Sequence, residues 1–166
     1  SVTYGAGGSN AANTVALASR LQAETGVPTL AHLTCIGSDR IKVKSILDTY
    51  AQAGIGNLLA LRGDWPPGIP HERAVSDYPH ASDLVAAIKS NPSEAFCVGG
   101  ACYPEGHPES ANREVDLENL THKVEAGCAF LTTQMFFDND MLYNFLYRAQ
   151  AKGIRVPILA GIMPIT

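Results

Sequence analysis

The stretch TLAHLTCIGSDRIKVKSILDTYAQAGIGNLLALRGD (residues 29–64) decides the fold. It opens with a mostly apolar run (29–35), which is typical of a strand covered by helices on both faces. A helical segment behind a candidate N-cap at Asp39 follows, and its apolar residues recur at i, i+3, i+4 and i+7: Val43, Ile46, Leu47 and Tyr50. Gly54 ends this helix and a second apolar run (57–62) follows. The stretch is one strand–helix–strand unit, and its strands are predicted to be parallel.

The same unit repeats along the chain. Further apolar runs lie at 96–103, 130–137 and 156–165, and residues 1–4 resemble the end of another strand. The predicted helices between them have candidate N-caps at Ser82 and Asp138 and end at Gly26, Gly127 and Gly153, or at residues 91–92. The repeat is about 32 residues long, and eight such units make a barrel of about 250 residues. The 166 residues therefore fit an open parallel sheet or an incomplete (β/α)₈ barrel, and no GxGxxG marks a dinucleotide-binding sheet.

Composition excludes several classes of protein. The net charge is −4 and no basic run occurs, so we expect neither a nucleic acid nor an anionic membrane surface as partner. No apolar run approaches the roughly 18 residues of a membrane span. The four cysteines form no CxxC pair, which predicts reduced buried thiols in a cytoplasmic protein, with no disulfide and no metal site.

Polar residues gather where the predicted strands end, which is where barrel enzymes carry their chemistry. These are Thr3, Tyr4, His32, Thr34, Arg62, Gly63, Asp64, Tyr103, Glu105, His107 and Gln134. Arg62 and Lys123 offer positive charge for phosphates, and a Gly-rich turn (5–8) offers backbone N–H groups. Asp116 and Asn119 share a helix face with spacing that suits ribose hydroxyls. Asp64 supplies a carboxylate that can stabilise a cationic intermediate.

At these residues the chain resembles the methylenetetrahydrofolate reductases, which are FAD-dependent barrel enzymes. The matching stretches occur in family order: SVTYGAGGS (1–9), AHLTCIG (31–37), LALRGDWPPG (59–68), YPEGHPES (103–110), TQMFFD (133–138), PILAGIMPI (157–165) and the D-x-x-N-x-x-x-K pattern of Asp116, Asn119 and Lys123. The resemblance implies a (β/α)₈ barrel of which residues 1–166 hold the end of strand 2 through strand 7.

The resemblance also implies roles for individual residues. FAD would be bound by Thr3, Tyr4, Ala6, His32, Arg62, Gly63, Asp64, Ala81, Tyr103, His107, Ser110, Asp116, Asn119 and Lys123. The folate substrate would meet Thr3, Asp64 and Gln134, with Asp64 as the catalytic group.

The implied reaction reduces 5,10-methylenetetrahydrofolate to 5-methyltetrahydrofolate, with NADH or NADPH as hydride donor. The substrate ring opens to an iminium cation that receives the hydride, and Asp64 suits the stabilisation of this cation. The family takes its proton donor from a Glu in an F-E-F-type segment, which these residues lack. We therefore expect the 166 residues alone to be inactive as a reductase, and the full-length parent to be a homo-oligomer.

Two other interpretations stay open on the residues alone. Another flavin barrel, similar to proline dehydrogenase, would share the fold, although the LRGD and YPEGHPE motifs argue against it. A non-catalytic module would bind a nucleotide at the strand ends and would give a flavin spectrum without folate-dependent reoxidation.

Overall fold

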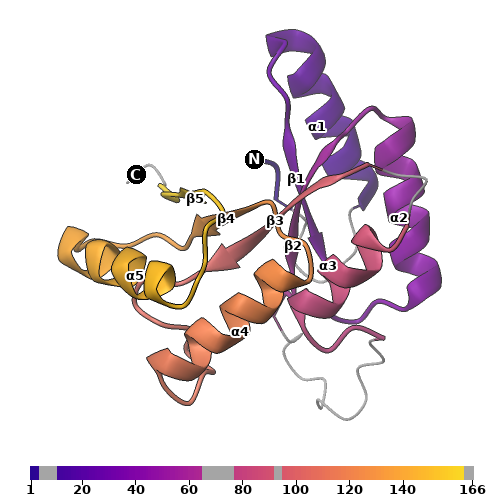
Figure 1. Ribbon diagram of the computed structural model, residues 1–166. Helices are drawn as coiled ribbons and strands as arrows, with labels where there is room; N and C mark the ends of the chain where they lie inside the picture. Colours follow the sequence, from indigo (N-terminus) through magenta and orange to yellow (C-terminus); the bar gives the residue numbers. More distant parts are fainter. Residues whose placement is uncertain (4–10, 65–76, 92–94, 163–166) are drawn as a thin grey trace. The chain divides into compact units, whose positions relative to one another are not determined.

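The computed structural model describes residues 1–3, 11–64, 77–91 and 95–162. Helices and strands alternate along them in the order α1 (Ala11–Thr25), β1 (Leu30–Thr34), α2 (Arg40–Gln52), β2 (Asn57–Leu61), α3 (Ala81–Lys89), β3 (Cys97–Cys102), α4 (Arg113–Glu125), β4 (Phe130–Thr133), α5 (Asn139–Ala151) and β5 (Ile158–Leu159) (Figure 1). The chain divides into two compact units, residues 1–98 and 99–166.

The strands are parallel, as the repeat predicts. In the first unit β1 pairs with β2 from Leu30↔Asn57 to Thr34↔Leu61, and Val2 forms a parallel bridge to Ala31. In the second unit β3 pairs with β4 from Gly99↔Phe130 to Cys102↔Thr133, and β4 pairs with β5. The strand order is β1-β2-β3-β4-β5. The α/β class with a parallel sheet is thus confirmed, whereas closure into a barrel stays a prediction.

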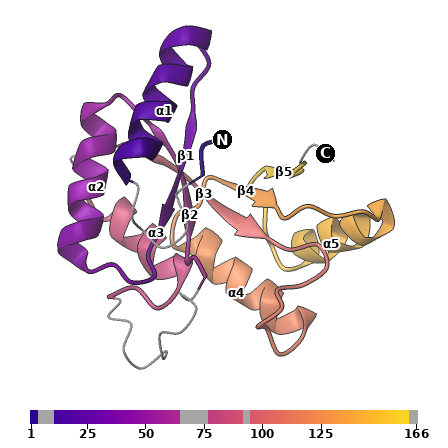
Figure 2. The same cartoon turned by 180° about the vertical axis from the view of Figure 1, so that it is seen from behind.

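Helices cover the strands of the first unit because the apolar stripes of the helices are buried by packing against the strands. Helix α1 packs against β1 and α2, and α3 packs against β2 (Figure 2). The predicted stripe of α2 is buried in full: Val43, Ile46, Leu47 and Tyr50. The hydroxyl of Tyr50 donates to the carbonyl of His32 at 2.9 Å, which ties α2 to the middle of β1.

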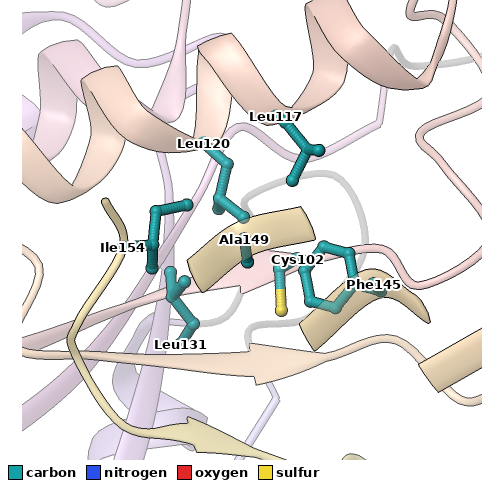
Figure 3. Packing of buried hydrophobic residues seen from close by; sticks show 7 residues of the cluster. All are labelled: Cys102, Leu117, Leu120, Leu131, Phe145, Ala149 and Ile154. Carbon is teal, nitrogen blue, oxygen red and sulfur yellow. The ribbon is translucent and has the colours of Figure 1, made fainter. Parts of the chain in front are cut away.

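The second unit has its own core, in which α4 and α5 pack against β3 and β4. Figure 3 shows its seven buried residues: Cys102, Leu117, Leu120, Leu131, Phe145, Ala149 and Ile154. On the outside, Glu114 of α4 forms ion pairs with Arg148 and Lys152 of α5. A buried apolar core on one side and charged pairs on the other fix the two helices to each other.

The predicted glycine stops are confirmed, since Gly26, Gly54, Gly127 and Gly153 all have positive φ. The N-caps at Asp39 and Asp138 are confirmed too. The cap at Ser82 is wrong: α3 begins at Ala81 behind His80, whose N–H donates to the Asp83 carboxylate at 2.9 Å. That bond starts the helix two residues earlier.

Each described strand is shorter than its predicted apolar run, and two are much shorter. The run 130–137 forms strand only to Thr133, and the run 156–165 forms strand only at Ile158–Leu159, with 163–166 outside the described residues. The expectation of four buried thiols is wrong for Cys97, which is exposed. In the described parts of the chain no helix is long and apolar enough to cross a bilayer, and no group of acidic, His and Cys side chains is arranged to hold a metal.

Candidate functional site

His32 lies in β1 with one ring nitrogen sealed from solvent. Its Nε2 is buried and has no hydrogen-bond partner among the described residues. Burial, and to a lesser extent the amino-terminal charge, lowers the pKa of His32 below its usual 6.5. The lowered pKa favours the neutral imidazole, whose Nε2 has no partner among the described residues.

Arg62, Gly63 and Asp64 directly follow β2, as predicted. Gly63 has φ +86°, and a Cβ at this position would stand 3.0 Å from Cγ2 of Ile36 and 3.1 Å from Cβ of Thr34. Only glycine suits this turn. The turn leaves Asp64 exposed just after the end of the strand.

A buried thiol joins three pieces of the first unit. Sγ of Cys35 donates to the carbonyls of Arg62 at 3.8 Å and His80 at 3.9 Å, so the residue after β1 contacts both the end of β2 and the residue before Ala81. Desolvation raises the pKa of Cys35 to about 11, which keeps the thiol protonated as a donor. Sequence reasoning missed this role, because a cysteine in an apolar run carries no sign of its partners.

The second unit brings together four predicted site residues in the loop after β3. The rings of Tyr103 and His107 meet edge to face with centroids 4.6 Å apart. The Asp116 carboxylate accepts the N–H of His107 at 3.3 Å and the hydroxyl of Ser110 at 3.2 Å. Asp116 thus orders the loop, a role that its spacing in the sequence did not indicate.

The side chain of Lys123 lies elsewhere than the sequence pattern predicted. The sequence pattern grouped it with Asn119 on one helix face, but Asn119 is exposed while Nζ of Lys123 turns inward and donates to the carbonyl of Ala101 at 2.7 Å. Desolvation lowers the pKa of Lys123. Across the described ranges no carboxylate forms an ion pair with it. Its ammonium is a desolvated positive charge at the end of β3.

The structure gives few contacts for the remaining predicted site residues. Gln134 is exposed just beyond β4, where its N–H donates to the carbonyl of Cys102 at 2.8 Å. Thr3 is exposed, and its carbonyl accepts the hydroxyl of Thr14 at 3.1 Å. Tyr4 and Ala6 lie outside the described residues. Of the described residues, Asp64 follows β2, Tyr103 and His107 follow β3 and Gln134 follows β4, whereas His32 lies inside β1.

Comparison with known proteins gives this arrangement a family. The model of the methylenetetrahydrofolate reductase family matches residues 1–166. The chain is 38% identical to 5,10-methylenetetrahydrofolate reductase of Pectobacterium carotovorum, covering 100% of this chain and 53% of that protein. It is 39% identical to methylenetetrahydrofolate reductase 2 of Schizosaccharomyces pombe, covering 99% of this chain and 28% of that protein. It is also 39% identical to methylenetetrahydrofolate reductase (NADH) 1 of Arabidopsis thaliana, covering 99% and 30%.

Solved structures share the fold at low identity. A phosphoenolpyruvate phosphomutase from Streptomyces platensis aligns with a TM-score of 0.66 and 17% identity over 91% of this chain and 53% of that one. A lyase or mutase from Burkholderia cenocepacia aligns with a TM-score of 0.61 and 18% identity over 95% and 55%. The chain spans about half the length of its bacterial relative and less than a third of the yeast and plant ones. On the match over its whole length, the chain belongs to the methylenetetrahydrofolate reductase family.

Proposed function

We propose that this chain forms the cofactor-binding part of an enzyme that reduces 5,10-methylenetetrahydrofolate to 5-methyltetrahydrofolate with NADH or NADPH. The observation that carries the proposal is the position of Asp64: an exposed carboxylate directly after β2, set there by a turn that only Gly63 suits. Family membership supports the reaction, and relatives named as NADH enzymes support a nicotinamide co-substrate.

Two features of the structure fit FAD as the cofactor. His32 has a buried Nε2 without a partner, which is a polar group that a bound heterocycle can satisfy. Lys123 carries a desolvated ammonium that has no carboxylate partner in the described residues. An anion such as a diphosphate would stabilise this positive charge. When bound, FAD supplies the hydride chemistry between the nicotinamide and the folate.

The chain's own residues bind and orient the cofactor and the folate, and they stabilise the charge that develops on the folate. Asp64 lies close to the charge that develops when the folate ring opens, and its carboxylate stabilises the iminium cation. Thr3 and Gln134, both exposed next to strands, contact the folate. Asp116 holds the loop that carries Tyr103 and His107 for the cofactor. Arg62, Gly63, Ala81, Ser110, Asn119, Tyr4 and Ala6 complete the proposed FAD set.

We further propose that the parallel strands belong to a (β/α)₈ barrel. The parallel pairing and the strictly alternating helices support this, because a parallel sheet collects the carboxyl ends of its strands at one edge. The likeness to larger solved structures, of which the chain covers 53–55%, supports a barrel with further units.

The test separates the two half-reactions by stopped-flow spectroscopy in the full-length parent protein, since we expect the 166 residues alone to be inactive. In Asp64→Asn we expect reduction of the cofactor by NADH to persist, because it forms no folate cation. Reoxidation by methylenetetrahydrofolate should slow by roughly 10²–10³-fold, as for the loss of one preorganised electrostatic group. Asp48→Asn is the matched control, since Asp48 is a carboxylate of α2 that pairs with Lys44 at the surface.

Equal reoxidation rates in Asp64→Asn and Asp48→Asn would contradict the role of Asp64. A flavin spectrum with no reoxidation by the folate in the unaltered full-length parent would instead favour a nucleotide-binding module without this catalysis.

A further inference from the structure

Lys123 reaches the end of β3 across a position where the strand has no side chain. Helix α4 carries Lys123 above β3, and its stem passes over Gly100 before the ammonium meets the carbonyl of Ala101. A Cβ on Gly100 would stand 2.6 Å from Cδ of Lys123 and 3.1 Å from Sγ of Cys128. A separation of 2.6 Å is well inside van der Waals contact, so the present path of the lysine requires glycine at this position.

The strand cannot move aside to make room. Gly100 pairs with Leu131 in the register of β3 and β4, and Leu131 is completely buried in the core of the second unit (Figure 3). The lysine stem is flexible and belongs to a helix surface, so it is the part that yields. With alanine at position 100, the ammonium leaves the Ala101 carbonyl.

We propose that Gly100 is a positioning residue whose missing side chain opens the path by which Lys123 delivers its ammonium to the end of β3. The identity of the ligand that meets this ammonium, the diphosphate of FAD, rests on the function proposed above. The path itself does not, because it follows from the contacts of Gly100 and Lys123. The titratable groups that influence Lys123 are Cys102, Cys128 and Asp116.

The first measurement follows the amine directly, without cofactor. Acylation of the folded full chain with acetic anhydride, read by peptide mass spectrometry, compares Lys123 with the exposed Lys44. We expect Lys123 to react several-fold more slowly than Lys44 in the unaltered chain. In Gly100→Ala the protection of Lys123 should be lost. The control is Gly56→Ala, because a Cβ at Gly56 meets nothing within 4 Å, and it should leave the protection unchanged.

The second measurement is a double-mutant cycle on FAD affinity, read by quenching of flavin fluorescence. With glycine at position 100, Lys123→Ala should raise the dissociation constant of FAD roughly 10- to 100-fold, as for the loss of a hydrogen bond to a charged group. Gly100→Ala alone should cause a similar rise. With alanine at position 100, Lys123→Ala should add little, because the ammonium has already left its place.

The stability of the same variants provides a third readout. Gly100→Ala should lower the unfolding midpoint, and Lys123→Ala should restore part of it by removing the crowded Cδ. Recovery of folding in the double variant would support the proposal even if Gly100→Ala did not fold alone; failure of both to fold would assign the clash elsewhere and overturn it.

The proposal is also overturned if Lys123 reacts as fast as Lys44 in the unaltered chain, or if Gly100→Ala changes neither protection nor FAD affinity. A chain that binds no FAD would contradict the proposed function, while the acylation result would still decide the role of Gly100.

Discussion

Three glycines of the first unit separate the cost of a backbone conformation from the cost of a close contact. Gly56 has neither constraint, Gly54 has φ +71° in open space, and Gly63 has φ +86° with Ile36 and Thr34 at 3.0–3.1 Å from a built Cβ. Alanine at Gly63 tests the turn that precedes Asp64, and alanine at Gly54 and Gly56 provides the comparison. All three substitutions add one methyl group, so they differ only in their surroundings.

The expected magnitudes follow from these surroundings. Gly56→Ala should stabilise the chain by about 0.5 kcal/mol, because alanine restricts the unfolded state. Gly54→Ala gains the same amount but pays about 1–2 kcal/mol for a left-handed residue, which leaves a net loss of about 1 kcal/mol. Gly63→Ala adds about 1 kcal/mol more for crowding, for a total near 2 kcal/mol.

Urea unfolding followed by circular dichroism measures the series. With a slope of about 2 kcal/mol per M, the midpoint should fall by about 1 M for Gly63→Ala and about half as much for Gly54→Ala. A loss for Gly63→Ala no greater than that for Gly54→Ala would refute the claim that the contacts with Ile36 and Thr34 restrict this turn.

Three further predictions concern the core, the ion pairs and the thiols. Phe145→Ala should cost about 3–5 kcal/mol in a urea titration, because it empties part of the core of the second unit; a loss below 1 kcal/mol would contradict the packing in Figure 3. The pairing of Glu114 with Lys152 lowers the pKa of Glu114 and raises that of Lys152. Glu114→Gln should therefore reduce stability in full between the ordinary pKa values of 4.5 and 10.5. Outside this window the loss should fade: the carboxylate's contribution is lost as pH falls through its lowered pKa, and the ammonium's as pH rises through its raised pKa. The loss should vanish in high salt, and persistence in 1 M salt would speak against an ionic origin. Iodoacetamide at pH 8 should alkylate Cys97 in the folded chain and reach the others only after unfolding, since burial raises their pKa to about 11 or 12: Cys35, Cys102 and Cys128. Fast modification of all four thiols in the folded chain would overturn this burial.

The periodic features of the chain were the predictable ones. The apolar stripe of a helix and the glycine that ends it both follow from local backbone geometry. Gly54 and Gly153 therefore mark helix ends in both the sequence and the structure. Strand lengths were overestimated because apolar character continues beyond the hydrogen bonds: Phe137 lies within an apolar run yet is 78% exposed. An apolar run records hydrophobicity, whereas a strand needs a paired neighbour.

Whether the candidate residues form one site stays a prediction, and their contacts could not be predicted from the sequence. Asp64 directly follows β2, as its place behind an apolar run predicted, whereas His32 lies inside β1 and not at its end. The inward turn of Lys123 was missed, since it depends on how closely α4 approaches Gly100, and residue spacing does not encode that distance. The cap at His80 was missed for a similar reason: a carboxylate three residues later determines it.

In the described residues the carboxylate of Asp116 uses only half of its capacity to accept hydrogen bonds. Each of its oxygens accepts one protein donor, the His107 N–H at Oδ2 and the Ser110 hydroxyl at Oδ1. An ionised carboxylate offers about four lone-pair directions. Among the described residues no further donor is hydrogen-bonded to the Asp116 oxygens, so the ribose contact proposed above would leave both loop hydrogen bonds in place. Loop order and sugar recognition would then reinforce one another rather than compete.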